Sequence, residues 1–229
     1  MYSTGMNAAS PDTSDARIAD SGRREHVLAA ALDTFARYGY RKTSMEDVAR
    51  AAAISRPGLY LLFGSKQELF SAAVTQALGQ SLAAVTEVLA DTTRPLRDRL
   101  LDAFDQWTGR YIGAMSREVN SMAGEYADML GPVVAEYPRR FAALLSAALA
   151  ESPDTAKAAR SAAVAQTLIS TSIGIKHEVT TREAFLERLA TAIDLIVGAL
   201  CHGARAGSAV AAIWVTCWPR AARRAGATR

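Results

Sequence analysis

The stretch SRPGLYLLFGSK, residues 55 to 66, sets a short apolar run between two polar ends, each of which carries a cation. The run from Leu59 to Phe63 is too short for an ordinary helix, and the sequence around it has no alternating pattern that would supply a partner strand. Ser55 is a favoured N-cap residue, and Pro57 falls in the first turn, where proline is tolerated. The stretch therefore predicts a short helix that Ser55 caps and that ends near residue 63.

Two more helices are predicted before this one. Apolar residues at three- and four-residue steps indicate a first helix that begins at Arg23 and is ended by Gly39. A tight turn at residues 53–55 joins a second helix to the third. The second helix opens with a capping box, for which the sequence offers two pairs: Thr43 with Glu46, or Ser44 with Asp47.

Three short helices between residues 23 and 63, the last two joined by a tight turn, are typical of a helix-turn-helix. In that motif the third helix lies in the major groove of DNA and the second crosses above it. Leu59 and Phe63 are four residues apart and share a face, which is expected to pack against Phe35, Val48 and Ile54. The other faces of the third helix are then free to approach DNA.

The residues expected to contact DNA lie on the third helix or beside it: Thr43, Ser44, Arg56, Pro57, Gly58, Tyr60, Leu61 and Lys66. Arg56 can pair bidentately with guanine or hold a phosphate. Gly58 lets the backbone come close to DNA. The hydroxyl of Tyr60 and the ammonium group of Lys66 suit phosphate oxygens.

Local charge supports a nucleic-acid surface in this segment. Residues 23–66 carry eight Lys or Arg against four Asp or Glu, whereas the whole chain of 229 residues has a net charge of only +3. A basic surface must therefore be a local patch. Thr43 and Ser44 are expected mainly as caps of the second helix, and their hydroxyls are also candidates for phosphate contact.

Four segments, in this order, resemble the DNA-binding domain of the tetracycline-repressor (TetR) family: FARYGY at 35–40, TSMEDVA at 43–49, SRPGLY at 55–60 and FGSKQEL at 63–69. The resemblance implies a homodimeric transcriptional regulator, usually a repressor, that a small molecule releases from its operator. One departure falls on the third helix. The family often has an aromatic or polar residue where this chain has Leu61, and His or Tyr where it has Leu62.

The rest of the chain is also predicted as helices, so the expected fold class is all-α. Apolar periods and caps indicate helices at about 65–90, 95–111, 116–130, 132–151, 152–177 and 180–200. The expected domains are a disordered leader at 1–21, a helix-turn-helix DNA-binding domain at 22–66, a helical effector-binding and dimerisation domain at 67–203, and a loose basic tail at 204–229.

Large, adaptable side chains in the middle helices suggest an effector pocket: Trp107, Tyr111, Met115, Met122, Tyr126 and Met129. An apolar pocket with a few polar groups suits a drug-sized ligand, so the expected effector is small and largely apolar. For each residue taken singly, a place in the ordinary core is the alternative. A filled core would favour a helix-turn-helix protein of the same fold that has no small-molecule effector and is controlled by a protein partner.

An apolar stripe on the last two helices suggests a homodimer interface. Helices near 154–177 and 182–202 carry it, through Val164, Leu168, Ile169, Ile173, Phe185, Leu189, Ile193, Ile196 and Leu200. Two such helices from each copy form a four-helix interface, and two heads about 34–36 Å apart can read both halves of a palindrome in double-stranded DNA. The alternative is that the stripe packs only within the chain.

Other functional classes lack their motifs. The sequence has no GxSxG elbow and no GxGxxG fingerprint, and its three histidines lie far apart, so no enzyme, metal or cofactor is expected. Cys201 and Cys217 are too few for a disulfide framework, which fits a reducing, cytoplasmic setting. No apolar run reaches the ~18 residues of a membrane span. No membrane partner is therefore expected. Membrane association through the run from Ala209 to Trp218 and the arginines after it is a distant alternative.

Overall fold

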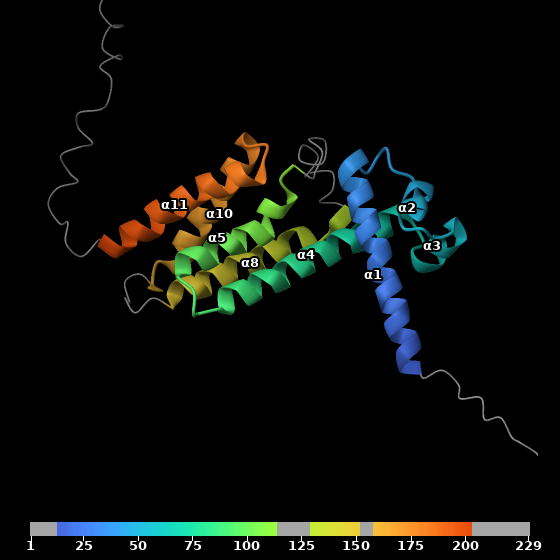
Figure 1. Cartoon of the computed structure of the whole chain (residues 1–229), viewed down its shortest axis with the longest axis horizontal. Helices are drawn as coiled ribbons and strands as arrows, with labels where there is room; N and C mark the ends of the chain where they lie inside the picture. Colours follow the sequence, from blue (N-terminus) through green and yellow to red (C-terminus); the bar gives the residue numbers. More distant parts are fainter. Residues whose placement is uncertain (1–12, 114–128, 152–157, 203–229) are drawn as a thin grey trace, which may run out of the picture.

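The structure is a computed structural model that describes residues 13–113, 129–151 and 158–202 (Figure 1). The elements in these ranges are α1 (Thr13–Tyr38), α2 (Met45–Ala51), α3 (Arg56–Leu62), α4 (Lys66–Ala90), α5 (Leu96–Trp107), the 3-10 helix η1 (Gly109–Tyr111), α8 (Val133–Ala150), α10 (Ser161–Glu178) and α11 (Arg182–His202). Every regular element in these ranges is helical, which confirms the all-α prediction.

The first hydrophobic cluster lies in the head, which consists of α1, α2, α3 and the first turns of α4. Leu59 and Phe63 are fully buried in this cluster, together with Phe35 and Val48, and Ile54 packs against it. The predicted packing of the third helix is therefore confirmed. Figure 1 shows the head gathered at one end of the molecule.

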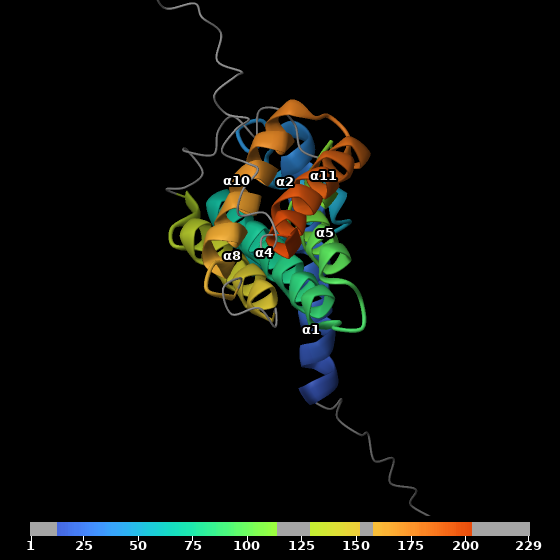
Figure 2. The ribbon, with the colours of Figure 1, turned by 90° about the vertical axis from the view of Figure 1, so that its left-hand side faces the viewer.

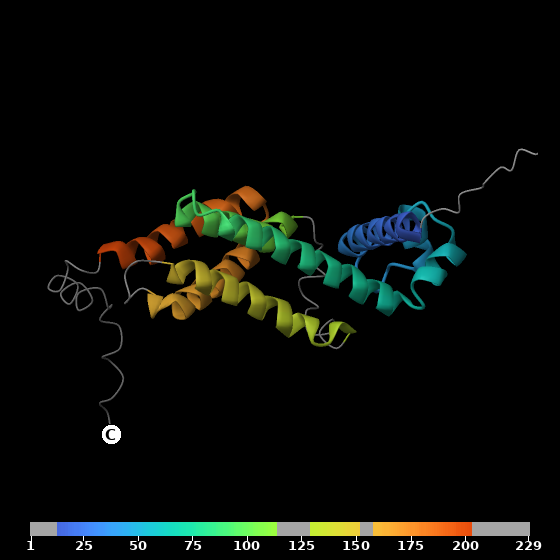
Figure 3. The same ribbon diagram turned by 90° about the horizontal axis from the view of Figure 1, so that it is seen from below.

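The head and the bundle share α4. Its first part, through Ala73, belongs to the head cluster, whereas Val85 and Leu89 belong to a second cluster with α5, α8, α10 and α11. Figure 3 shows α4 connecting the head with this bundle. The expected border between residues 66 and 67 therefore falls within the sequence span of the head cluster, and one continuous helix links the two clusters.

The helix α1 begins at Thr13, ten residues before the expected start at Arg23. The prediction of a disordered leader is therefore wrong for residues 13–21. Residues 21–26 are exposed, so this end of α1 has no apolar period from which a helix can be recognised. The rest of the expected leader, residues 1–12, lies outside the described residues.

The second cluster fills the bundle. Its largest fully buried side chains include Phe104, Phe141, Leu168, Phe185 and Leu189. Figure 2 shows α4, α5, α8, α10 and α11 lying together, and the pairs α4–α5, α4–α8, α8–α10, α10–α11 and α5–α11 are in contact. The helix expected from about residue 152 begins instead at Ser161, and residues 152–157 and 203–229 lie outside the described residues.

Ionic contacts that each involve one buried side chain, Asp105 or Arg99, tie α5 into the bundle. Arg182 at the start of α11 donates two hydrogen bonds to the buried carboxylate of Asp105, the first at 2.7 Å from Nε to Oδ1. The buried Arg99 donates to the carbonyl of Leu89 and, at 3.0 Å, to Glu151 Oε2. These contacts fix α5 against α11 on one side and against the ends of α4 and α8 on the other.

Candidate nucleic-acid interface and effector cleft

The short helix α3 has a buried face and an exposed face. The hydroxyl of Ser55 accepts a hydrogen bond of 3.1 Å from the backbone N–H of Gly58, which satisfies one of the free donors in the first turn. Leu59 faces the head cluster, and the exposed residues are Arg56, Pro57, Tyr60 and Leu61. All four were expected to contact DNA, and the structure brings them together on the surface of the head.

Arg56 is positioned by its neighbours on the same surface. Its Nη1 lies 3.6 Å from Oε2 of Glu46 on α2, and its guanidinium lies 5.7 Å from the ring centroid of Tyr60. Tyr60 is 43% exposed and Leu61 is 88% exposed. A cation, a hydroxyl and an apolar side chain therefore stand side by side at the tip of the molecule.

The helix α2 begins with the Ser44 and Asp47 capping box. The Ser44 hydroxyl accepts from the N–H of Asp47 at 3.2 Å, and the Asp47 carboxylate accepts from the N–H of Ser44 at 2.9 Å. Hydrogen bonds from the hydroxyl and then the backbone of Ser44 lower the pKa of Asp47 below its ordinary value. This selects one of the two pairs that the sequence left open.

Thr43 has a different place from the one expected. It is 2% exposed, and its hydroxyl donates to the carbonyl of Gly39 at 2.8 Å. The predicted phosphate contact through this hydroxyl is therefore wrong for this conformation, because the group lies beneath the surface and already has an acceptor. Ser44 is exposed, as a phosphate contact would require.

Lys66 is tied to the loop between α1 and α2. Its ammonium group donates to the carbonyls of Tyr40 and Thr43, both at 3.1 Å, and lies 4.4 Å from the ring centroid of Tyr40. A cation at the start of a helix interacts unfavourably with the helix dipole, and the hydrogen bonds to these carbonyls compensate for that cost. A phosphate contact by Lys66 stays a prediction.

Two features of the head were missed from the sequence. Arg24 of α1 donates to the carbonyl of Leu62 at 3.2 Å and lies 4.3 Å from the ring centroid of Phe63, so it closes the end of α3. Its partners are almost forty residues away, and no local pattern signals them. A side chain at Gly58 would place its Cβ 3.0 Å from the Ser55 hydroxyl oxygen, so this glycine also protects the cap.

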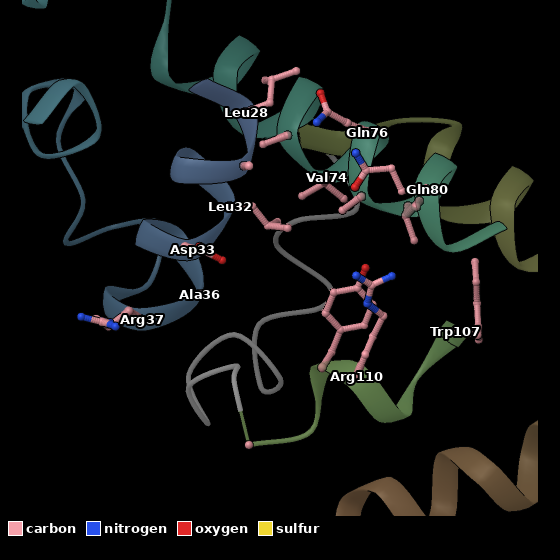
Figure 4. A pocket seen from close by; sticks show the side chains of 16 residues that line it. Leu28, Leu32, Asp33, Ala36, Arg37, Val74, Gln76, Gln80, Trp107 and Arg110 are labelled. Atoms are coloured by element: carbon pink, nitrogen blue, oxygen red, sulfur yellow. The ribbon is translucent and has the colours of Figure 1, made fainter. Parts of the chain in front are cut away.

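A cleft of about 990 Å³ lies between the head and the bundle (Figure 4). Its walls come from α1, from the middle of α4 and from the segment from Trp107 to Gly113. Trp107 and Tyr111 line it, as two of the six residues expected in an effector pocket. Met115, Met122 and Tyr126 lie outside the described residues.

Met129 is not brought together with Trp107 and Tyr111. It packs against the head cluster and lines a separate shallow groove beside Arg24 and Ser71. Met129 is therefore not among the residues that line the cleft, and its membership of the predicted pocket stays a prediction, because three of the six predicted residues lie outside the described ranges. Trp107 also serves the core, because its ring stacks on Phe141 with centroids 4.7 Å apart.

The cleft has apolar walls and a few polar groups. Leu28 and Leu32 of α1 face Val74 and Leu78 of α4, and the polar side chains that join them include Asp33, Gln80 and Arg110. Figure 4 shows Arg110 rising from η1 toward Gln80. The hydroxyls of Tyr111 and Ser81 lie 2.8 Å apart in a hydrogen bond, which anchors η1 to α4.

Most of the stripe expected at a dimer interface lies in the core of the protomer. Leu168, Phe185, Leu189 and Ile193 are fully buried by the chain itself, and Val164 is nearly so. The intramolecular alternative is therefore correct for these five residues. Their period reflects burial in the bundle, which a sequence cannot distinguish from burial in a dimer.

Other apolar residues of the same two helices do face outward. Ile173 of α10 is 52% exposed, and Leu195 of α11 is 69% exposed. Ile169 and Ile196 are half-buried, and the side chain of Leu200 lies outside the described residues.

Two further expectations concern membranes and metals. None of the helices in the described ranges is long and apolar enough to cross a membrane. The run from Ala209 to Trp218 lies outside these ranges. Among the described residues, no three His, Cys, Asp or Glu side chains gather as a metal site would require.

Comparison with known proteins matches the head to one family. Residues 27–73 match the family model described as bacterial regulatory proteins, tetR family. HTH-type transcriptional regulator RutR of Escherichia coli (strain K12) is 38% identical over 58 residues, which are 25% of this chain and 27% of RutR. Uncharacterized HTH-type transcriptional regulator YfiR of Bacillus subtilis (strain 168) is 30% identical over 115 residues, which are 50% of this chain and 49% of YfiR.

The whole fold has relatives among solved structures. A TetR-family transcriptional regulator from Mesorhizobium loti MAFF303099 has a TM-score of 0.62 at 16% identity, covering 78% of this chain and 96% of that chain. At this identity the likeness concerns the fold alone. The sequence matches span half or less of the length of RutR and YfiR, both of which are described as HTH-type transcriptional regulators. Residues 27–73 thus match the tetR family of bacterial regulatory proteins in sequence, and most of the chain is similar in fold to a solved TetR-family regulator.

Proposed function

We propose that the protein is a transcriptional repressor of the cytoplasm that binds a palindromic DNA operator as a homodimer and is released by a small molecule. The observation that carries the DNA-binding part is the exposed face of α3. Arg56, Tyr60 and Leu61 project from the tip of the head, while Leu59 and Phe63 hold the helix from below. A short helix presented in this way suits the major groove.

The DNA-binding step is tested by selecting bound duplexes from a random pool with the full chain, which should return a palindrome. If about 6–10 phosphates are contacted, affinity for that sequence should fall roughly 10³–10⁵-fold between 50 and 200 mM salt. Arg56→Ala should weaken binding, whereas Arg139→Ala, an exposed arginine on α8, should not. A flat salt response would exclude a phosphate-binding surface.

The homodimer is proposed to form through α10 and α11, with the outward residues Ile173 and Leu195 in the contact. A stable interface buries about 1,200–2,000 Å² in total, and its centre is apolar. The double variant Ile173→Glu with Leu195→Glu should therefore shift the mass measured by light scattering from two chains to one. Val134→Glu, an exposed position on α8, is the matched control. A dimer that survives the double change would place the interface elsewhere.

The effector is proposed to bind in the cleft between α1 and α4. The volume of this cleft lies at the upper end of the range for drug-sized ligands, and its walls are apolar with a few polar groups. A ligand there touches α1 of the head and η1 of the bundle at once, so its contacts change whenever the head shifts. A ligand moves an equilibrium only through such a difference in affinity, typically by about 1–3 kcal/mol.

A screen of small, largely apolar compounds tests this step through melting temperature and operator release. Two variants test whether an active compound binds in the cleft. Leu32→Trp should fill the cleft and abolish both responses, whereas Val134→Trp, at an exposed position on α8, should leave both unchanged. Compounds that raise the melting temperature without releasing DNA would contradict control by this cleft. If no compound acts, the rival is a protein of this fold that is controlled by a protein partner.

A further inference from the structure

The outward face of α3 is largely apolar at its centre. Pro57 and Leu61 are four residues apart, and Tyr60 lies beside them, so the three share one face of the helix. Leu61 has the largest exposed fraction among the large apolar side chains in the described part of the chain. A single exposed leucine is ordinary on a protein surface, but this one lies in the middle of the face that is proposed to enter DNA.

The hydrogen-bonding groups of α3 lie away from that centre. Arg56, at the first position of the helix, extends toward Glu46 on α2 and toward the ring of Tyr60. Pro57 and Leu61 have neither donor nor acceptor on their side chains. Pro57 and Leu61 therefore cannot recognise a base edge through side-chain hydrogen bonds, and the hydroxyl of Tyr60 is the hydrogen-bonding group beside them.

Base edges in the major groove display one apolar group, which is the C5-methyl group of thymine. The other groups there are donors and acceptors, and each loses a water partner if an apolar side chain covers it. Leu61 therefore stabilises a complex most when it packs on a methyl group. It stabilises a complex least when the same position offers an amino group or an oxygen.

We propose that Leu61 reads a pyrimidine 5-methyl group, that of thymine, in each operator half-site. This inference rests on the proposed function, since it assumes that α3 enters the major groove. Charge favours DNA over a protein as the occupant of this face. Arg50 and Arg56 stand exposed on α2 and α3, and cations outnumber acids two to one in residues 23–66. The same contact predicts a preference for 5-methylcytosine over cytosine at that position.

The test starts from the operator that the full chain selects from a random duplex pool. Each thymine is replaced by deoxyuridine, which removes the methyl group and keeps every hydrogen-bonding group. In each half-site, one thymine should be sensitive to this replacement. Replacing it in one half-site should raise the dissociation constant roughly fourfold, because that is about the effect of burying one methyl group, and replacing it in both half-sites should raise it roughly fifteenfold. At the same position, 5-methylcytosine should bind roughly fourfold more tightly than cytosine.

Two variants assign the effect to the side chain. Leu61→Ala should bind thymine and deoxyuridine operators equally well, and it should fold normally, because Leu61 buries little surface and alanine favours helix. Val134→Ala changes an exposed apolar residue on α8 and should keep the full discrimination. Circular dichroism and melting temperature confirm that both variants remain folded.

The outcomes separate the two levels of the proposal. A chain that binds no duplex contradicts the proposed function. A chain that binds its operator but is insensitive to every thymine methyl group contradicts the role of Leu61 and leaves the function standing. A methyl preference that persists in Leu61→Ala also contradicts the inference, because another residue would then read the methyl group.

Discussion

The head and the bundle are held together by different kinds of contact. In the head, α2 and α3 have seven residues each, and polar contacts secure their ends: the caps Ser44 and Ser55, Arg24 on the carbonyl of Leu62, and Lys66 on two loop carbonyls. In the bundle, long helices bury wide apolar stripes, and ion pairs such as Arg182 with Asp105 and Arg99 with Glu151 join them. We therefore expect the bundle to be sensitive to lost volume and the head to lost hydrogen bonds.

The largest effect is expected in the bundle, from Phe141→Ala. Phe141 is fully buried between Phe104, 5.3 Å away between ring centroids, and Trp107. Its loss should leave a cavity and lower the free energy of unfolding by about 3–5 kcal/mol. Urea denaturation followed by circular dichroism measures this, and Val134→Ala on the same helix should change it by no more than about 0.5 kcal/mol.

The same experiment tests whether the two regions are independent. Because α4 carries residues of both clusters, we expect one cooperative transition in which head and bundle unfold together. Two transitions, of which Phe141→Ala shifts only one, would show that the head and the bundle fold separately.

The next effect concerns the ion pair between α5 and α11. Asp105→Ala should leave the guanidinium of Arg182 without its acceptor and reduce the free energy of unfolding by about 1–3 kcal/mol, at the lower end because Arg182 is half exposed and screened by water. Asp194→Ala is the matched comparison, because Arg97 holds Asp194 by two similar bonds at the surface. Equal losses from the two substitutions would mean that burial of Asp105 adds nothing.

A smaller and more local effect is expected from Lys66→Met. The variant keeps the aliphatic stem but removes the donors to the carbonyls of Tyr40 and Thr43. Amide hydrogen exchange should accelerate in residues 40–62, by roughly fivefold if about 1 kcal/mol is lost, and it should stay unchanged in the bundle. Arg37→Met, an exposed position on α1, should show no such change. Acceleration spread evenly over the chain would contradict a local role.

Local signals in the sequence were sufficient for the elements of the head. The caps Ser44 and Ser55, the glycine at position 39 and the spacing of Leu59 and Phe63 act within a few residues, and the structure has all of them. The first turns of α1 escaped notice because residues 13–26 contain a single large apolar residue, Ile18, which is too few for an apolar period.

The long-range contacts could not be predicted from the sequence. Nothing near Arg24 or Asp105 indicates partners that lie 38 and 77 residues away. The stripe through Leu189 and Ile193 predicted burial correctly but named the wrong partner, because the period of a helix is the same whether it faces its own bundle or a second copy. The sequence predicted only part of the cleft for a related reason. One of its walls is α1, and the apolar period of α1 makes Leu28 and Leu32 look like ordinary core positions.

The smallest expected effect is a pH dependence at the start of α2. The hydroxyl and backbone of Ser44 hold the pKa of Asp47 below its ordinary value of 3.8 in the folded chain, so the carboxylate is favoured by folding. Its contribution is fully present above that value and is lost as the pH falls through the lower pKa of the folded state. Ser44→Ala removes the hydroxyl and should flatten the fall of stability below about pH 4. The difference between the urea midpoints of the two proteins isolates this group, since Asp91 and Asp194, whose pKa values are also lowered, are present in both. Midpoints that run parallel from about pH 6 to about pH 3 would mean that the charge of Asp47 adds nothing to the capping box, whose hydrogen bonds would then be as effective with a neutral side chain.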